Sequence, residues 1–287
     1  MRAALIYNPL AGKRQAARIG AIAARMAREL GATLTLHEVA GRGHGTVLAR
    51  EAIANGAERV VSVGGDGTNN AIARALVGTN VPLGIVAMGS GNGYARSIGL
   101  PLRPEPALRH ALTAAPRRMD VCYLNDELVL GNAGVGFDAR VAHRFERLGR
   151  RGMLGYARII AQEILGAKPM RVVLKANAAT SEHRVLMLVF CNTREFGNGV
   201  DISPSSQPDD GVAELRVVRK PSLLPLLKAF FDAYTHRVDR NPHVLGFAAT
   251  EAQAWQEGTL AHIDGEPVEL GHHLRFRLEA RRLLVVA

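Results

Sequence analysis

One stretch, residues 59–70, combines the groups that a phosphate-binding site needs with a single carboxylate. A run of valines leads into Gly64-Gly65-Asp66-Gly67-Thr68, and a helical pattern follows. The valines favour a strand covered on both faces. The glycines allow close backbone approach to a ligand, and a helix N-terminus offers its N–H groups to an anion. An ordinary turn of an open α/β sheet has the same layout, so local chemistry alone leaves both interpretations open.

Two acidic turns in the second half of the chain are further candidates. The first reads Gln207-Pro208-Asp209-Asp210-Gly211, and its hard oxygen ligands suit Mg²⁺ or Ca²⁺, although most Asp-Gly turns bind nothing. The second reads His262-Ile263-Asp264-Gly265-Glu266, with two carboxylates on what is otherwise a routine hairpin turn. The sequence contains no HExxH, no GxSxG and no Cys/His pair at a useful spacing, so zinc and serine hydrolysis lack support.

Composition limits the classes of partner and the compartment. The 287 residues carry a net charge of +10, which favours a negatively charged partner. Aromatic residues make up only 5%, so we do not expect a stacking platform for nucleic acid. Cys122 and Cys191 lie in apolar runs without CxxC spacing, which predicts buried, reduced thiols. The N-terminal apolar run is too short for a signal peptide, and no stretch is long enough to span a membrane. We therefore expect a cytosolic protein with peripheral membrane contact.

The first part of the chain alternates strand and helix patterns. We expect strands at 3–7, 33–39, 59–64 and 81–88, each followed by a helix. The fourth strand runs into a second glycine loop, Gly89-Ser90-Gly91-Asn92-Gly93. Both glycine loops then lie at the carboxyl ends of parallel strands, where ligands bind in open α/β sheets. The pair of loops therefore favours a ligand site more strongly than either loop alone.

Beyond residue 116 the pattern changes to short strands. A hairpin is expected around Asn125-Asp126, a glycine-rich segment at 131–137 is expected at the domain junction, and a long helical region is expected at 138–168. The remaining strands are predicted at 171–176, 184–192, 212–218, 246–250, 260–263, 273–279 and 282–286, with a helix near 222–235. The predicted fold is an α/β N-terminal nucleotide-binding domain with an open, mostly parallel sheet, residues 1–121, plus a β-rich C-terminal domain, residues 122–278. Residues 279–287 could complete the first domain.

The segment 140–171 concentrates positive charge, with eight Arg or Lys against two Glu. A solvated helix face is the ordinary interpretation. Phe145, Leu148, Met153, Leu154 and Tyr156 are interleaved with the arginines, so a surface that meets anionic lipid headgroups is an equal alternative.

Taken together, these stretches resemble the diacylglycerol kinase catalytic-domain superfamily, which includes soluble bacterial lipid kinases and sphingosine kinases. The resemblance spans nearly the whole chain, and GGDGT combined with a GSGN loop and a late DGE is far more specific than GGDGT alone. The matching pieces are Asn8-Pro9 with Gly12, Gly64 to Thr68, Gly89 to Asn92 with Ala95-Arg96, Asp120, Gly134 to Asp138, Pro204 with Asp210-Gly211, and Asp264-Gly265-Glu266.

The resemblance implies a cofactor, a metal site and a base. It places ATP on the two glycine loops and Asn8, with the binding residues Asn8, Gly64, Gly65, Asp66, Gly67, Thr68, Asn69, Asn70, Ser90, Gly91 and Asn92. It implies Mg²⁺ at Asp210 with carbonyls of Gln207 and Val212. It implies that Asp264 and Glu266 take the proton from a lipid hydroxyl, while Asp66 acts in catalysis by coupling to a magnesium–water network. Asp120 matches an acidic position of the family near the domain junction.

Some residues depart from the family pattern, and other functions remain alternatives. Diacylglycerol-type members usually carry Asp where this chain has Gly93, and the positions of Ala71 and Val39 also differ, so the lipid and the nucleotide preference stay open. The resulting prediction is an ATP-dependent lipid kinase that acts on a lipid substrate and makes peripheral contact with an anionic membrane. No nucleic-acid partner is expected, and the sequence does not decide between a monomer and a homo-oligomer. The alternatives are a kinase similar to NAD kinase, and a non-catalytic basic membrane- or nucleic-acid-binding protein.

Overall fold

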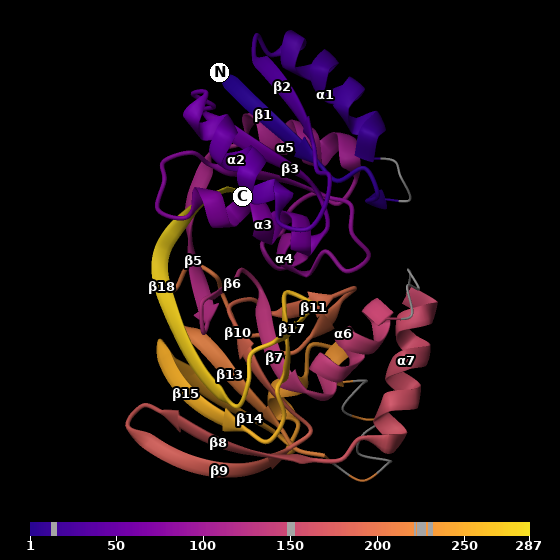
Figure 1. Ribbon diagram of the computed structural model, residues 1–287, viewed down its shortest axis with the longest axis vertical. Coiled ribbons are helices and arrows are strands. Elements are labelled where there is room, and N and C mark those ends of the chain that lie inside the picture. Colours follow the sequence, from indigo (N-terminus) through magenta and orange to yellow (C-terminus); the bar gives the residue numbers. More distant parts are fainter. Residues whose placement is uncertain (13–15, 148–152, 221, 223–227, 229–231) are drawn as a thin grey trace. The chain divides into compact units, whose positions relative to one another are not determined.

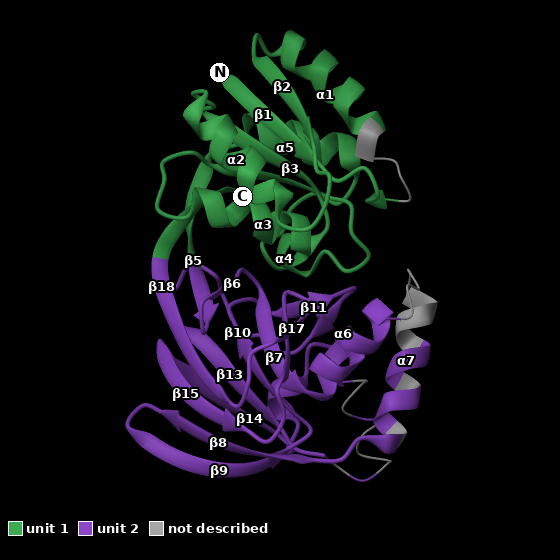
Figure 2. Ribbon diagram, in the orientation of Figure 1, with its two compact units in different colours: residues 1–120, 281–287 green, residues 121–280 purple. Residues whose placement is uncertain are grey.

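The chain folds into two compact units that two crossings of the backbone connect. The computed structural model describes residues 1–12, 16–147, 153–220, 222, 228 and 232–287 (Figure 1). Unit 1 comprises Met1–Asp120 and Arg281–Ala287, and unit 2 comprises Val121–Ala280 (Figure 2). The boundaries predicted from the sequence, after residues 121 and 278, lie close to these crossings.

Unit 1 is built on a parallel sheet with strand order β2-β1-β3-β4. The strands are β1 (Arg2–Tyr7), β2 (Thr33–Glu38), β3 (Arg59–Gly64) and β4 (Leu83–Ala87). Every residue of β3 and β4 is buried, as expected for strands covered on both faces. The chain steps from β1 to β2 on one side and to β3 on the other. Such a reversal of strand order creates the crevice in which open α/β sheets bind ligands.

Helices cover both faces of this sheet. They are α1 (Ala16–Glu29), α2 (His44–Ala54), α3 (Asp66–Leu76), α4 (Gly93–Ser97) and α5 (Pro104–Thr113). On one face, Met26 of α1 and Leu108 of α5 pack against Leu5 and Val61 of the strands. On the other face α2 packs beside α3 (Figure 1), and the Thr46 hydroxyl donates to the Ala71 carbonyl, 2.5 Å away. The sheet is therefore a rigid base for the loops that leave its carboxyl edge.

Unit 2 is a sandwich of antiparallel strands. One layer has the order β14-β13-β10-β7-β16-β17, formed by β7 (Asn132–Gly136), β10 (Met187–Cys191), β13 (Ala213–Val218), β14 (Val244–Ala249), β16 (Leu260–Ile263) and β17 (Glu266–Glu269). The other contains β8 (Met170–Ala176), β9 (Ala179–Val185), β15 (Glu251–Gln256) and the start of β18 (His273–Val286). The two layers share one core, in which the rings of Phe190 and Phe276 stack with centroids 5.0 Å apart.

A hairpin and a helix pair complete unit 2. The hairpin of β5 (Pro116–Leu124) and β6 (Glu127–Val129) turns at Asn125, whose φ is +54°. Helices α6 (Phe137–Arg147) and α7 (Met153–Gly166) pack through Phe137, Val141 and Ile159. A short hairpin of β11 (Glu195–Gly197) and β12 (Val200–Asp201) follows β10.

The predicted fold class, an α/β domain followed by a β-rich domain, is confirmed, and several details of the predicted elements are wrong. The glycine-rich segment 131–137, which was expected at the domain junction, contains a buried strand, β7, that was not predicted, and its small residues leave room for neighbouring side chains. The expected strand 184–192 spans the end of β9 and all of β10, and the two expected C-terminal strands form the single strand β18. Strands β15 and β17 were missed. Most of the helix expected at 222–235 lies outside the described residues.

The C-terminal end of β18 belongs to unit 1. The buried carboxylate of Asp120 holds the backbone at the point where this strand joins the unit 1 sheet. Val285 pairs in parallel with Leu83 of β4. The Arg281 N–H, in a residue with φ of +57°, donates to Asp120 Oδ1 at 2.7 Å, and Asp120 is fully buried. The left-handed backbone is unfavourable for a residue with a side chain, so Asp120 stabilises a bend that connects the last strand to the sheet.

Substitution of Asp120 tests this contribution. We expect Asp120→Ala to lower the free energy of unfolding by about 1–3 kcal/mol, because it removes a hydrogen bond to a charged acceptor at a buried site. The exposed Asp126 provides the control, and Asp126→Ala should change stability by less than about 0.5 kcal/mol. Urea unfolding would measure both, and equal midpoints for the two variants would contradict the assignment.

Candidate active-site residues

Three loops at the carboxyl edge of the unit 1 sheet are tied together by backbone hydrogen bonds. The Asn8 N–H, after β1, donates to the Val63 carbonyl at 3.0 Å. The Gly12 N–H donates to the Met88 carbonyl at 2.9 Å, and the Met88 N–H donates to the Gly64 carbonyl at 2.7 Å. The loops after β1, β3 and β4 therefore form one surface at the point where the strand order reverses.

The two glycine loops touch through their backbones. A Cβ on Gly89 would lie 2.7 Å from the Gly65 Cα, and a Cβ on Gly65 would lie 3.2 Å from the Gly89 Cα. A Cβ on Gly12, whose φ is +57°, would lie 2.5 Å from the Met88 Cε. Only glycines allow this close approach. The result is a cradle lined by main chain, and α3 begins in it at Asp66 without a side-chain cap.

The carboxylate of Asp66 connects the two glycine loops. It accepts the Gly93 N–H at 3.2 Å and the Tyr94 N–H at 3.4 Å, the first residues of α4. A negative charge at a helix N-terminus is favourable. Asp66 therefore positions the second glycine loop, a role that the sequence did not predict. The backbone amide of Gly93 is one of the two donors that make this contact.

The other predicted nucleotide-binding residues range from exposed to fully buried. Ser90 is exposed, and Asn92 turns its Oδ1 back to accept the Gly89 N–H at 2.8 Å. Gly67, Thr68 and Gly91 are half-buried. Asn69 is fully buried, and its Oδ1 accepts the Ser62 hydroxyl at 2.7 Å, while the Asn70 Oδ1 accepts from Arg74 Nε at 3.0 Å. Asn69 thus attaches α3 to β3, and Asn70 makes a side-chain contact within α3.

In unit 2, the carboxylate of Asp264 is held by three backbone N–H groups. Its Oδ1 accepts from Gly131 at 2.7 Å and from Asn132 at 3.1 Å, and its Oδ2 accepts from Leu130 at 3.1 Å. The Asp264 N–H donates to the Asn132 carbonyl at 2.8 Å. Asp264 has a φ of +50° and precedes Gly265 at +83°, which is the geometry of a two-residue hairpin turn between β16 and β17. Glu266 is exposed at the start of β17.

The segment that holds Asp264 is supported from the end of β10. The Asn192 and Thr193 N–H groups donate to the Gly131 carbonyl at 2.9 and 3.2 Å, and Asn192 Nδ2 donates to the Leu130 carbonyl at 2.7 Å. Asn132 Nδ2 donates to the Glu195 carbonyl at 2.7 Å. The Asp264 carboxylate therefore lies in a polar framework whose members fix one another.

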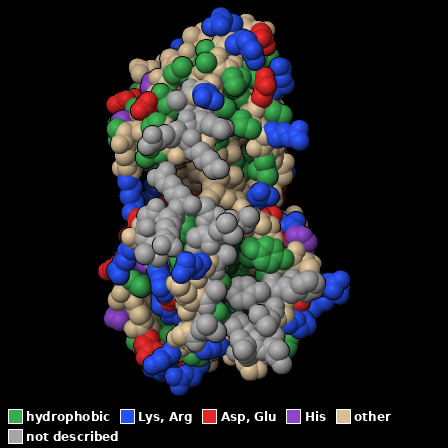
Figure 3. Space-filling model, turned by 90° about the vertical axis from the view of Figure 1, so that its right-hand side faces the viewer, with side chains coloured by type: hydrophobic (Ala, Val, Ile, Leu, Met, Phe, Trp, Pro, Cys, Tyr) green, Lys and Arg blue, Asp and Glu red, His purple; other side chains and the backbone are tan. Residues whose placement is uncertain are grey.

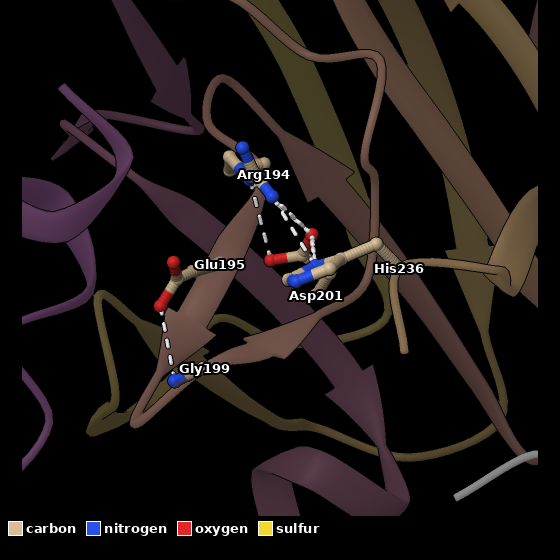
Figure 4. A network of polar contacts seen from close by, with 5 residues as sticks. All are labelled: Arg194, Glu195, Gly199, Asp201 and His236. Atoms are coloured by element: carbon tan, nitrogen blue, oxygen red, sulfur yellow. Dashed lines mark hydrogen bonds and ion pairs between the residues drawn. The ribbon is translucent and has the colours of Figure 1, made fainter. Parts of the chain in front are cut away.

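A buried acid stabilises the hairpin that follows this framework (Figure 4). Asp201 is fully buried, and it accepts from Arg194 Nη2 at 2.8 Å and pairs with His236 Nδ1 at 2.5 Å. The hydrogen bond to Asp201 raises the pKa of the Arg194 guanidinium, so this side chain stays charged. Glu195 Oε2 accepts the Gly199 N–H at 3.1 Å in the same hairpin. No motif in the sequence indicates this network, and His236 lies 35 residues beyond Asp201 in the chain.

The predicted metal turn presents Gln207 and Asp210 at the surface. Asp210 is exposed, and its Oδ1 accepts the Val212 N–H at 3.0 Å, with Gly211 at φ +79°. Gln207 is exposed and Val212 is half-buried. Among the described residues, no three Asp, Glu, His or Cys side chains come together as a metal-ligand set. A site here would thus use one carboxylate with main-chain carbonyls and water.

Sequence reasoning missed a buried pair beside the Asp264 turn. His262 Nε2 lies 3.1 Å from Asp138 Oδ2, and His262 Nδ1 lies 3.3 Å from the Gly265 N–H. His262 is 3% exposed. Asp138 ends the glycine-rich stretch 134–138, and His262 begins the acidic turn 262–266. Nothing in the sequence indicates that these two distant positions are in contact.

The cysteines have no part in a site. Cys122 and Cys191 are buried and form no disulfide, as predicted. Burial raises the pKa of the Cys191 thiol, so it stays protonated and is a poor nucleophile.

Several of the basic side chains in 140–171 form contacts inside unit 2. Arg140 and Arg144 pair with Glu163. Arg171 pairs with Glu182 at 2.8 Å and lies over the Trp255 ring. Arg147, Arg158 and Lys168 are exposed, whereas residues 148–152 lie outside the described part. Within the described residues, no helix has the length and apolar character that crossing a bilayer requires.

Two family models match consecutive parts of the chain. The model for the diacylglycerol kinase catalytic domain matches residues 2–124, and the model for the YegS C-terminal NAD kinase beta sandwich-like domain matches residues 131–283. The two matches follow the division of the structure into an α/β unit and a β-rich unit.

Known proteins resemble the chain over most of its length. A Chromohalobacter salexigens protein named "Probable lipid kinase YegS-like" is 32% identical over 252 residues, 84% of this chain and 79% of the relative. A Mycobacterium tuberculosis diacylglycerol kinase is 29% identical, over 78% of this chain and 75% of that protein. The crystal structure of a diacylglycerol kinase from Bacillus anthracis str. Sterne superposes with a TM-score of 0.80 at 19% identity, covering 99% of this chain and 96% of that one, which supports the fold.

The family models together match residues of both units, and the similarity to the lipid-kinase relative covers 84% of the chain. The chain therefore belongs to the diacylglycerol kinase catalytic-domain superfamily of lipid kinases.

Proposed function

We propose that this protein transfers the γ-phosphate of ATP to a hydroxyl group of a lipid at a membrane surface. The observation that carries the proposal is the Asp264 carboxylate, which three backbone N–H groups fix in one orientation. A base must be positioned before it can accept a proton from an attacking hydroxyl. The same chain carries a glycine-lined cradle of the kind that accommodates phosphates.

We assign ATP to the cradle of unit 1. The contact between Gly65 and Gly89 leaves main chain, without side chains, at the surface where phosphates would lie. The N-terminus of α3, an eleven-residue helix without a side-chain cap, presents N–H groups and a positive dipole end to an anion. Ser90 is exposed on the second loop and would add a hydroxyl donor. These residues fit a nucleoside triphosphate.

Mg²⁺ fits the donors of the Asp210 turn. This ion is commonly held by one or two carboxylates and keeps several waters, and Asp210 with the carbonyls of Gln207 and Val212 offers such a set. When bound, the ion would neutralise negative charge. We assign Asp66 to the magnesium–water network of the nucleotide through the carboxylate that already links both glycine loops.

In the reaction, the lipid hydroxyl oxygen forms a bond to the γ-phosphorus while the bond to the β–γ bridging oxygen breaks and ADP leaves. The hydroxyl proton passes to Asp264. The backbone N–H bonds engage both oxygens of this carboxylate, which holds it in one orientation for the transfer. Glu266, two residues further on, supplies a second carboxylate at the same turn. Phosphoryl transfer depends mainly on positioning and charge neutralisation.

The proposed setting is the cytoplasmic surface of an anionic membrane, where the product would enter phospholipid metabolism. Support comes from the net charge of +10 and from the exposed Arg147, Arg158 and Lys168. Lys and Arg side chains also occur over the described surface drawn in Figure 3. Basic side chains near a membrane are attracted by its negative surface potential. The proposed association is peripheral.

The decisive experiment is phosphorylation of a total lipid extract in vesicles with γ-labelled ATP and Mg²⁺, followed by identification of the labelled lipid. A parallel reaction supplies NAD instead of lipid, because the second family model is named for its likeness to NAD kinase. Label in a lipid supports the proposal. Label in NAD alone would replace it, and label in neither would favour a non-catalytic protein.

Replacement of the proposed base should abolish most of the activity. We expect Asp264→Asn to lower kcat by about 10²–10⁴-fold, the usual contribution of a general base, with smaller changes in KM. Asn tolerates the left-handed backbone, so the turn should persist. The matched control is Asp126→Asn in the exposed hairpin turn, and wild-type kcat in Asp264→Asn would refute the assignment.

The cradle should be sensitive to a single added methyl group. In Gly89→Ala the new Cβ would collide with the Gly65 backbone, so the loops must separate and the dissociation constant for ATP should rise about tenfold or more. Calorimetric titration with ATP would measure this directly. Gly258→Ala is the control, because a Cβ there meets only Gln256 Oε1 at 3.9 Å. Equal ATP affinity in both variants would exclude the cradle as the nucleotide site.

A further inference from the structure

His262 lies between two groups that flank the Asp264 turn. Its Nε2 is 3.1 Å from Asp138 Oδ2, at the start of α6, and its Nδ1 is 3.3 Å from the Gly265 N–H. The side chains of His262 and Asp138 are 4% and 9% exposed. The imidazole therefore connects a buried carboxylate to the backbone of the turn that carries the proposed base.

These contacts define one tautomer of the imidazole. A backbone N–H can only donate, so His262 Nδ1 must accept with its lone pair. A neutral imidazole then carries its hydrogen on Nε2 and donates it to Asp138 Oδ2. A doubly protonated ring could not accept the Gly265 N–H.

The surroundings fix the orientation of both side chains. Asp138 Oδ1 accepts the Ala139 N–H at 2.8 Å, which orients the carboxylate. Phe196 packs edge-on against the His262 ring, with centroids 5.9 Å apart. Gly134, the partner of His262 across β7 and β16, leaves the necessary space, because a Cβ there would overlap Asp138 Oδ2 and lie 2.7 Å from His262 Nε2.

The turn itself needs such support. Asp264 adopts a φ of +50°, which is unfavourable for a residue with a Cβ, and Gly265 follows at +83°. The three N–H groups of residues 130–132 hold the carboxylate from one side. The bond from the Gly265 N–H to His262 holds the backbone from the other.

We propose that His262 and Asp138 are positioning residues that fix the Asp264 turn, so that the Asp264 carboxylate keeps the orientation needed to accept the substrate proton. The role in catalysis rests on the proposed function, in which Asp264 is the base. Asp138 orients His262, and His262 orients the Gly265 amide. The proposal gives neither residue a direct contact with the substrate.

Two substitutions separate the two halves of the imidazole. His262→Gln keeps a donor near the Nε2 position for Asp138 but loses the acceptor for Gly265. His262→Asn keeps an acceptor near the Nδ1 position for Gly265 but loses the contact to Asp138. We expect the Gln variant to lower kcat about 10- to 100-fold, the usual effect of losing a residue that orients a reactive group, and the Asn variant to lower it less. The KM for ATP should stay within about twofold in both.

A purely structural role would give a different result. If His262 only filled the core, kcat would follow the loss of thermal stability in both variants, without the expected order. His183→Gln is the matched control, because His183 also makes a ring hydrogen bond in unit 2, to Ser181 Oγ at 2.8 Å on β9. It should keep wild-type kcat. Equal kcat in His262→Gln and wild type would overturn the proposal.

Two measurements on folded protein are independent of turnover. Long-range ¹⁵N–¹H spectra of the wild type should show His262 as the Nε2–H tautomer, and the Nδ1–H tautomer would refute the contact to Gly265. Amide hydrogen exchange at Gly265 should be faster in His262→Gln than in His262→Asn. If these results hold but Asp264→Asn remains active, the assignment of the base is wrong while the positioning contact stands. If Asp264→Asn is inactive but both His262 variants keep full kcat, the positioning role is wrong while the proposed function stands.

Discussion

The orientation of the Asp264 turn in unit 2 depends on the binding of one carboxylate by three consecutive backbone N–H groups. Asp264 reaches these groups only because Leu130, Gly131 and Asn132 present their amides in the same direction. That arrangement requires the carbonyls of the segment to be engaged elsewhere, and Asn192 and Thr193 donate to them. A side chain held by main chain depends little on neighbouring rotamers, so it keeps its position with little loss of entropy when a ligand binds.

In unit 1 the constraint is different, because the two loops of the cradle can approach each other only where they carry glycine. The approach of Gly65 to Gly89 leaves no room for a Cβ on Gly89 and little room for one on Gly65. Asp66 then holds the second loop through the amides of Gly93 and Tyr94. A phosphate site built from main chain binds charge without contributing a cation of its own. This accounts for the need for a separate cation if ATP is the ligand, because four phosphate charges exceed what a helix dipole offsets.

Features encoded in short stretches could be predicted from the sequence. The valine run of β3, the two glycine loops and the hairpin at Asn125 are local patterns, and the structure contains each of them. Strand β15 was missed because Glu251–Gln256 contains, apart from Trp255, only Ala, Glu and Gln, and Ala and Glu have weak strand propensity. The contact of Asp138 with His262 could not be predicted, because it depends on the pairing of β7 with β16. The sequence of neither strand determines which residues of the two distant strands lie opposite each other.

The difference between local and distant information also applies to two carboxylates, Asp66 in unit 1 and Asp264 in unit 2. Asp66 was recognised from its neighbours, yet its contacts with Gly93 and Tyr94 give it a structural task that its motif does not reveal. Asp264 was recognised from the DGE motif, yet other residues orient it. The amides of residues 130–132 lie more than 130 positions away in the chain, whereas His262 precedes the same turn. A motif therefore identifies which residue can react, whereas the strand pairing of the sandwich decides whether that residue points in a fixed direction. In a kinase whose chemistry consists mainly of positioning, we infer that the second requirement places as much constraint on the sequence as the first.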